Sequence, residues 1–296
     1  MGEKRRGHSG EMKKGKLLVV PGMLWLAIFF ALPMLIVVAV SFATRNAYGQ
    51  VIFNFTLSNY QRFFESLYLR IFATTIFTAI VTTVITFLMG YPLAYTISIL
   101  PKKWQQPSLV LVMIPFWINF LIRSYAWVII LRSQGIINTF SLKMGLIEKP
   151  LTLLYNDYAV MLGMIYALVP FMVLPIYVSI EQLDKRLLEA ASDLGAPPLT
   201  AFRKITLPLT MPGIAAGSIL VFISSLGMFV VPDIMGGAKS ALIGNIIQNQ
   251  FLAARDWPFG SALSIVLGIL ALLLIMLYYK VLEGQKGVTN NEKKLA

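Results

Sequence analysis

Three polar residues in or beside long apolar runs are the side chains with the most scope for chemistry: Asn119, Arg123 and Asp233. Arg123 interrupts an apolar run, and Asn119 lies four residues before it, on the same face of a helix. Asp233 ends another apolar run. Because a polar group is costly to bury in hydrocarbon, such residues are candidates for a solute route. Arg123 could instead reach towards lipid headgroups, and Asp233 could be a solvated helix end, so both alternatives stay open.

The sequence argues against most catalytic chemistry. It has no cysteine and only one histidine, His8, in a basic tail. Thiolate and histidine metal sites and a Ser-His hydrolase are therefore excluded. No phosphate-binding G-x-x-x-x-G-K-[ST] loop is present; residues 236–240 (GGAKS) imitate only its end. We expect a non-catalytic chain without a cofactor, so energy for active transport must come from a partner ATPase or an ion gradient.

The composition is that of an integral membrane protein, with 57% hydrophobic and only 13% charged residues among 296. Six largely uncharged runs could each cross a bilayer as a helix. These runs are Leu17–Thr44, Ile71–Pro101, Trp104–Ile122 extended past Arg123 to Leu131, Tyr158–Ile180, Ile205–Pro232 and Trp257–Tyr279. The sequence therefore predicts an all-α protein with six transmembrane helices. Its net charge of +12 is explained by lysine and arginine residues that are held on the cytoplasmic side of a membrane. We therefore expect no nucleic-acid partner.

Lysine and arginine counts give the orientation. With both termini inside, the cytoplasmic segments hold 16 of these residues and the outer loops seven. This split predicts an N-in, C-in topology. The first apolar run is too long for a signal peptide and is read as a retained span. The expected organisation is a basic cytoplasmic tail at 1–16, a transmembrane domain at 17–282 and a cytoplasmic tail at 283–296. The core of that domain is expected at about 70–280, with a cytoplasmic loop at 181–210.

Three outer segments are more than simple connectors. Residues 45–69 are rich in aromatic side chains, as in segments that lie at lipid headgroups. Ile136–Leu146 and Leu242–Ala254 have the pattern of short helices. Interfacial packing and docking of a partner remain equally open for all three.

The cytoplasmic stretch from Leu183 to Pro212 is ordered by local signals. Asp184 is a good N-cap for a helix over Lys185–Leu194, and Gly195 is a natural residue just after its end. The helix carries one apolar stripe: Leu183, Leu187, Ala190, Ala191 and Leu194. A second short helical piece is expected around Thr200–Thr206. A short amphipathic helix between two membrane spans is suited to docking into a partner.

The same stretch resembles a known family. Glu189-Ala190-Ala191, Gly195, Ile205 and Leu207-Pro208 have the EAA---G---------I-LP spacing of the cytoplasmic loop of binding-protein-dependent ABC importer permeases. The resemblance implies the type I importer permease fold and a coupling helix that inserts into an ATP-binding subunit. Glu189 would make polar contacts there, and Gly195 would supply the turn. Asp184 and Leu187 belong to the same expected site.

Longer segments are similar to the B-type permeases of spermidine/putrescine importers, over almost the whole chain. They are Ile114–Trp127, Ser179–Ala196, Leu207–Ile214 and Met235–Ala262. This resemblance implies inward polyamine transport across a bacterial inner membrane, beside a C-type permease, two ATP-binding subunits that hold ATP and Mg²⁺, and an extracytoplasmic polyamine-binding protein. The expected pathway residues are Phe116, Trp117, Asn119, Arg123, Phe229 and Asp233. The outer loops carry more basic than acidic residues, so a polycation would need local aromatic and acidic contacts.

Two alternatives remain open from the residues. One is a permease of the same superfamily for another small solute, such as iron(III), sulfate or an opine. The other is a gradient-driven secondary transporter or a channel subunit, which would need no ATPase partner.

Overall fold

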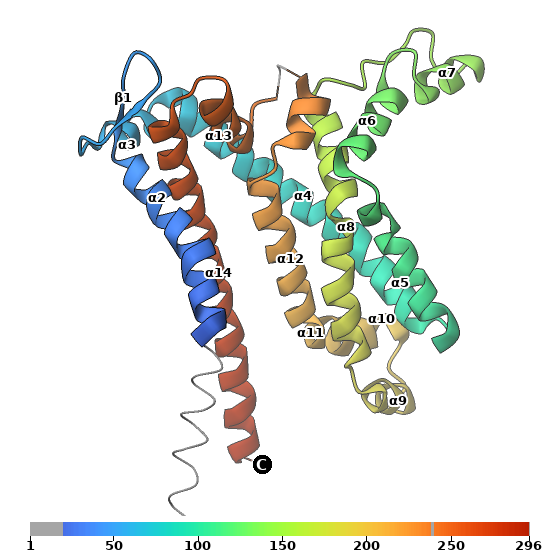
Figure 1. Ribbon diagram of the computed structural model, residues 1–296. Helices are drawn as coiled ribbons and strands as arrows, with labels where there is room; N and C mark the ends of the chain where they lie inside the picture. Colours follow the sequence, from blue (N-terminus) through green and yellow to red (C-terminus); the bar gives the residue numbers. More distant parts are fainter. Residues whose placement is uncertain (1–19, 238–239, 296) are drawn as a thin grey trace, which may run out of the picture. The chain divides into compact units, whose positions relative to one another are not determined.

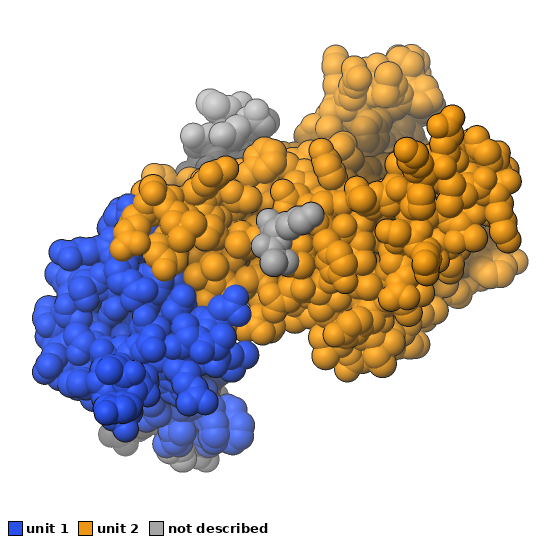
Figure 2. All heavy atoms as spheres, turned by 90° about the horizontal axis from the view of Figure 1, so that it is seen from above, with its two compact units in different colours: residues 1–64, 249–266 blue, residues 65–248, 267–296 orange. Residues whose placement is uncertain are grey.

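The structure is a computed structural model that describes residues 20–237 and 240–295. It forms two compact units, which Figure 2 distinguishes by colour. One comprises residues 20–64 and 249–266, and the other the remaining described residues. Residues 1–16, the expected basic tail, lie outside the described part of the chain.

The first unit begins with the apolar helix Val20–Ser41, which has a mean hydropathy of 2.7. It contains a π-helical turn, η1 (Ala27–Ala31), followed by α2 (Leu32–Ser41). A hairpin of two short antiparallel strands follows, β1 (Thr44–Arg45) and β2 (Val51–Ile52), and then α3 (Ser58–Phe63). The expected interfacial segment at 45–69 thus begins as a hairpin, and these short strands are a small departure from the all-α prediction.

Polar side chains hold the first unit together. Asn59 of α3 is buried, and its Nδ2 donates to the carbonyls of Ser41 at 3.0 Å and Ala43 at 2.8 Å, just after α2. Arg62 pairs with Asp256 at 2.8 Å, and its guanidinium lies 3.9 Å from the centre of the Phe259 ring. The two hydrogen bonds of Asn59 satisfy carbonyls that the end of α2 leaves without helical partners.

The second unit is built around three helices that pack against one another (Figure 1). They are α4 (Ser66–Ile99), α8 (Asp157–Glu181) and α12 (Met211–Leu226). The other elements of this unit are α5 (Lys102–Trp117), α6 (Phe120–Leu131), α7 (Ile136–Lys143), α9 (Lys185–Asp193), α10 (Pro198–Ala201), η2 (Phe202–Thr206), α11 (Leu207–Leu209) and η3 (Pro232–Gly236). Two further helices, α13 (Ile243–Leu252) and α14 (Trp257–Leu295), contribute residues to both units.

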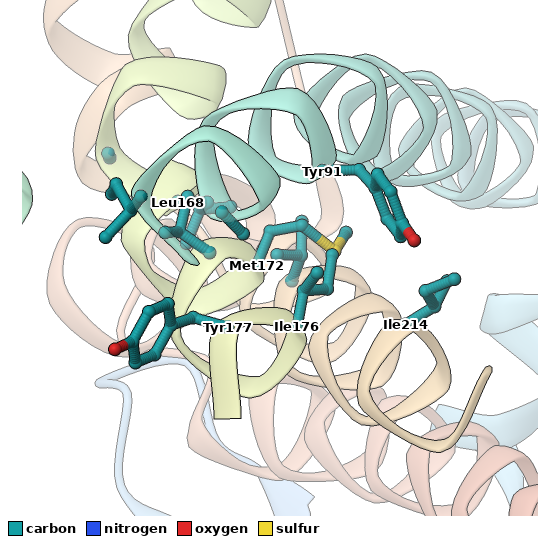
Figure 3. Close-up of a cluster of buried hydrophobic side chains, with 11 residues drawn as sticks. Tyr91, Leu168, Met172, Ile176, Tyr177 and Ile214 are labelled. Atoms are coloured by element: carbon teal, nitrogen blue, oxygen red, sulfur yellow. The ribbon is translucent and has the colours of Figure 1, made fainter. Parts of the chain in front are cut away.

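The core of the second unit lies where α4, α8 and α12 meet (Figure 3). Met172 of α8 is completely buried there. A Cβ atom added to Gly90 of α4 would lie 3.0 Å from Met172 Cγ, and one added to Gly217 of α12 would lie 2.9 Å from Met172 Sδ. Small residues thus let the helix backbones approach each other closely, as is usual between membrane helices.

The six-span prediction needs two corrections. Within the described residues, five helices are long and apolar enough to cross a membrane, or six if a pair bent by 62° between Leu209 and Met211 counts as one. The expected continuous third span is wrong, because Ile118 and Asn119 are extended and separate α5 from α6. The expected fifth span, Ile205–Pro232, is shorter: α12 begins after the bend at Thr210 and ends at Leu226.

Several boundaries agree with the sequence. The short helices expected at Ile136–Leu146 and Leu242–Ala254 are confirmed as α7 and α13. The last span begins at Trp257, as expected, but α14 continues through most of the expected tail to Leu295. Within the second unit, α9, α10 and the start of α5 lie at one end, and α7 lies at the other (Figure 1). This arrangement agrees with the expected topology, while the orientation in a membrane stays a prediction.

Candidate functional site

The helix α9 is defined by its own ends. The Asp184 carboxylate accepts a hydrogen bond from the Arg186 amide at 3.0 Å, which confirms the expected N-cap. At the other end, Gly195 has a φ of +74°. The Gly195 amide donates to the Ser192 carbonyl and the Ala196 amide to the Ala191 carbonyl, both at 2.9 Å. This is a Schellman ending, so the expected role of Gly195 in the turn is confirmed.

The apolar stripe of α9 is only partly covered by the described chain. Ala191 is buried, whereas Leu187 is 45% and Leu194 88% exposed. Exposed leucines in a row on an amphipathic helix mark a surface suited to binding a partner. Glu189 lies outside this stripe and lines a cavity of about 580 Å³ between α9 and the ends of α4, α5 and α8.

The chain after α9 is anchored on α4. Phe202 of η2 makes edge-to-face contacts with Tyr91 and Tyr95, at ring-centre distances of 5.6 and 5.9 Å. At the bend, Thr210 is buried and its hydroxyl lies 3.1 Å from the Tyr91 hydroxyl. The expected motif residues Ile205, Leu207 and Pro208 form the short helical piece between these anchors, and Leu207 packs against the buried core. These contacts anchor the segment between α9 and α12 on α4 and on the buried core.

A pair of substitutions at Gly195 tests this ending. A Cβ atom at Gly195 would meet nothing within 4 Å, so any cost comes from the positive φ and from charge. Gly195→Asp places a carboxylate beside the last carbonyls of α9, against the helix dipole, whereas its isostere Gly195→Asn lacks that charge and tolerates this conformation. We expect the amides of Gly195 and Ala196 to exchange hydrogen about fivefold faster in Gly195→Asp than in Gly195→Asn. Equal exchange rates would contradict this account.

Arg123 closes the break between α5 and α6. The Asn119 side chain caps α6 by accepting from the Leu121 amide at 2.9 Å. Arg123, one turn further on, is 8% exposed, and its Nη1 donates to the Pro115 carbonyl at 2.8 Å in the last turn of α5. Its guanidinium also lies over the rings of Phe120 at 5.0 Å and Tyr166 at 5.5 Å. A cation here stabilises the negative end of α5 and satisfies a carbonyl that has no helical partner.

A cavity of about 550 Å³ opens beside this break. Four of the six expected pathway residues line it: Phe116, Trp117, Asn119 and Arg123. Trp117 is 76% exposed, so its ring can contact a solute that enters the cavity. Sequence reasoning missed the residues that line the cavity from α8, from α12 and from the segment just after α12, namely Ala167, Leu168, Phe171, Ser224 and Met228. Within their own spans these residues resemble ordinary apolar helix positions, and only helix packing brings them to the cavity.

Phe229 and Asp233 do not line this cavity. The Asp233 carboxylate accepts a hydrogen bond from Asn245 Nδ2, and the same nitrogen donates to the Phe229 carbonyl at 2.9 Å. Both residues therefore belong to a polar contact between the start of α13 and the chain before it. Within residues 20–237 and 240–295, no group of three acidic or histidine side chains could hold a metal ion.

The family is decided by comparison with known proteins. Residues 89–285 match the model of the binding-protein-dependent transport system inner membrane component. This chain belongs to that family. The matched region includes α9, the Arg123 cavity, α8, α12 and the last part of α4.

Curated members of this family extend the likeness to most of the chain. The sequence is 45% identical to the spermidine/putrescine transport system permease protein PotB of Haemophilus influenzae, over 86% of this chain and 90% of that protein. It is 45% identical to PotB of Escherichia coli, over 86% and 93%. It is also 30% identical to the inner membrane ABC transporter permease protein YdcU of Escherichia coli, over 88% and 86%.

Two solved structures of ABC transporters share the fold. The chain matches a bacterial alginate ABC transporter, in complex with its periplasmic protein, with a TM-score of 0.71 at 19% identity, covering 91% of this chain and 94% of that one. A methionine ABC transporter, MetNI, matches with a TM-score of 0.52 at 20% identity, covering 71% and 92%. At such identities the likeness shows the fold alone. The chain is thus an inner membrane permease with the fold of ABC importer subunits.

Proposed function

We propose that this chain is the B-type permease subunit of an ATP-driven polyamine importer. The observation that carries the solute assignment is the 45% identity to a spermidine/putrescine permease, over 86% of this chain and 90% of that protein. Cation–π contact from Trp117 and neighbouring aromatic rings to ammonium groups is compatible with this solute. The cavity also contains Arg123, but that guanidinium already bonds the Pro115 carbonyl and lies over aromatic rings.

In this proposal the chain performs no catalysis. Two ATP-binding subunits hold ATP and Mg²⁺, a C-type permease completes the membrane dimer, and an extracytoplasmic binding protein delivers the polyamine. One ATP-binding subunit receives α9, where Leu187 and Leu194 offer the apolar contact and Glu189 the polar one. Closure of the ATPases then moves α9 and, through it, the helices around the cavity.

A competition uptake assay tests the solute. Cells that lack their own polyamine importers would express this permease with the partner subunits encoded by its host. We expect ATP-dependent uptake of labelled spermidine. An excess of unlabelled spermidine or putrescine should lower this uptake at least tenfold. Uptake that neither polyamine inhibits, but that an opine, sulfate or iron(III) does, would overturn the polyamine assignment and leave the permease assignment standing.

A further inference from the structure

Two polar contacts join the first turn of α5 to the last turn of α8. Tyr177 donates from its hydroxyl to Gln105 Oε1 at 3.2 Å, and Lys102 pairs with Glu181 at 2.5 Å. The partners are three residues apart on α5 and four apart on α8, so each pair lies on one helix face. We call these four residues, Lys102, Gln105, Tyr177 and Glu181, the clasp.

Gln105 is the buried centre of the clasp, with 5% exposure. Its Nε2 donates to the carbonyls of Ser98 and Leu100, both at 2.9 Å, at the end of α4. Because both these partners can only accept, the amide nitrogen must face them, and Oε1 must face the Tyr177 hydroxyl. All polar groups of this one side chain are therefore used, and they tie α4, α5 and α8 together.

The charged pair has an unusual placement. Lys102 is the first residue of α5, at the positive end of that helix dipole, and Glu181 is the last residue of α8, at the negative end of its own. Each charge is unfavourable with respect to its own helix and favourable towards its partner. Because the pair is exposed, it contributes little to the stability of the fold. Its main effect is to join the two helix ends.

The clasp lies between the two functional regions. After Glu181, only three residues lead to the start of α9. Glu189 of α9 lines the same 580 Å³ cavity as Lys102, Gln105 and Glu181. At its other end, about 24 Å away by helix rise, α5 lines the Arg123 cavity with Phe116 and Trp117.

We propose that the clasp makes the start of α5 move together with the end of α8, so that displacement of α9 reaches the Arg123 cavity through α5. Gln105 is the main positioning residue, and the Lys102–Glu181 pair supports it. This inference rests on the proposed function, because it takes α9 as the segment that the ATPase moves.

The first test replaces Gln105 with leucine, which keeps the volume but removes the three hydrogen bonds. In the assembled transporter we expect ATP-dependent spermidine uptake to fall about five- to tenfold at equal amounts of membrane-inserted protein. Gln106→Leu is the matched control, since Gln106 is the adjacent glutamine of α5 and its side chain is exposed. Equal uptake by the two variants would overturn the proposal.

The second test is a charge exchange. Lys102→Glu and Glu181→Lys should each lower uptake about two- to threefold, with Lys103→Glu as the control at a neighbouring exposed lysine. The double exchange restores the pair and places each charge at the favourable end of its helix dipole, so uptake should recover to within 1.5-fold of the parent. If the loss of uptake in the double variant equals the combined losses of the two single variants, the pair has no role.

A third readout separates the clasp from the identity of the solute. The chain has no cysteine, so Ile118→Cys, at the cavity end of α5, reports on accessibility to a thiol reagent. ATP should change its labelling rate at least threefold in the assembled complex, and Gln105→Leu should remove this change. If ATP changes the labelling rate and Gln105→Leu removes that change, but polyamine is not taken up, then the solute assignment fails and the clasp stands. If labelling still responds to ATP in Gln105→Leu, the clasp fails whatever the solute.

Discussion

Leu187→Glu is expected to separate this permease from its ATP-binding partner. Leu187 is 45% exposed on the apolar stripe of α9, next to Leu194 at 88%. Burying a leucine side chain in an interface contributes roughly 1.5–3 kcal/mol, and a buried carboxylate without a partner costs more. We therefore expect at least a 100-fold weaker association. The measurement is co-purification of the ATPase subunit with the tagged permease, together with ATP-dependent uptake.

The matched control for Leu187→Glu is Ser192→Glu. Ser192 lies five residues further along α9, which places it roughly on the opposite side of the helix, and it is exposed. The same charge at that position should leave co-purification within threefold of the parent. If Leu187→Glu also leaves the ATPase bound, then α9 is not the docking helix and the ATPase binds elsewhere on the permease.

Arg123→Met is expected to damage the cavity beside the break between α5 and α6. The substitution removes the hydrogen bond to the Pro115 carbonyl and the contacts with the aromatic rings. A charge-assisted hydrogen bond contributes about 1.5–3 kcal/mol and a partly buried cation–π contact about 0.5–2 kcal/mol. We expect a loss of about 2–4 kcal/mol at the break, seen as at least 30-fold slower uptake per inserted permease and a lower Tm.

Two further variants make the Arg123 result specific. Arg123→Lys keeps the charge but lacks the planar guanidinium, so it should retain an intermediate activity. Arg132→Met removes an exposed arginine at the C-terminal end of the same helix and should transport within twofold of the parent. Transport by Arg123→Met that equals transport by Arg132→Met would show that the break needs no buried cation.

Local signals in the sequence were sufficient to predict the features that depend on residues close to one another in the chain. The α9 helix begins at the expected cap and ends at the expected glycine, because Asp184 and Gly195 act on amides within a few positions. The spans follow from composition, since a long uncharged run has few stable environments other than a bilayer. The prediction of a continuous third span was wrong because it rested on composition alone. The apolar run continues through Ile118, and composition does not show that this residue is extended.

The signals for that break were nevertheless present. Pro115 lies near the end of α5, and Asn119 is a residue type that caps helices. A second helix start could therefore have been expected at Phe120. What the sequence did not reveal is that Arg123 turns back to the Pro115 carbonyl, because an arginine at that depth could as well extend towards headgroups.

The sequence by itself determined the membrane class, the approximate spans and the two ends of α9, since these depend on composition and on contacts within one or two turns. Only the tertiary structure decided the cavity and the clasp. Gln105 and Tyr177 are 72 residues apart, and Phe171 and Ser224 reach the Arg123 cavity from two different helices. In each of their own helices they are ordinary positions. Their roles arise from how α4, α5, α8 and α12 pack, and one-dimensional periodicity gives the face of a helix but not the partner it meets.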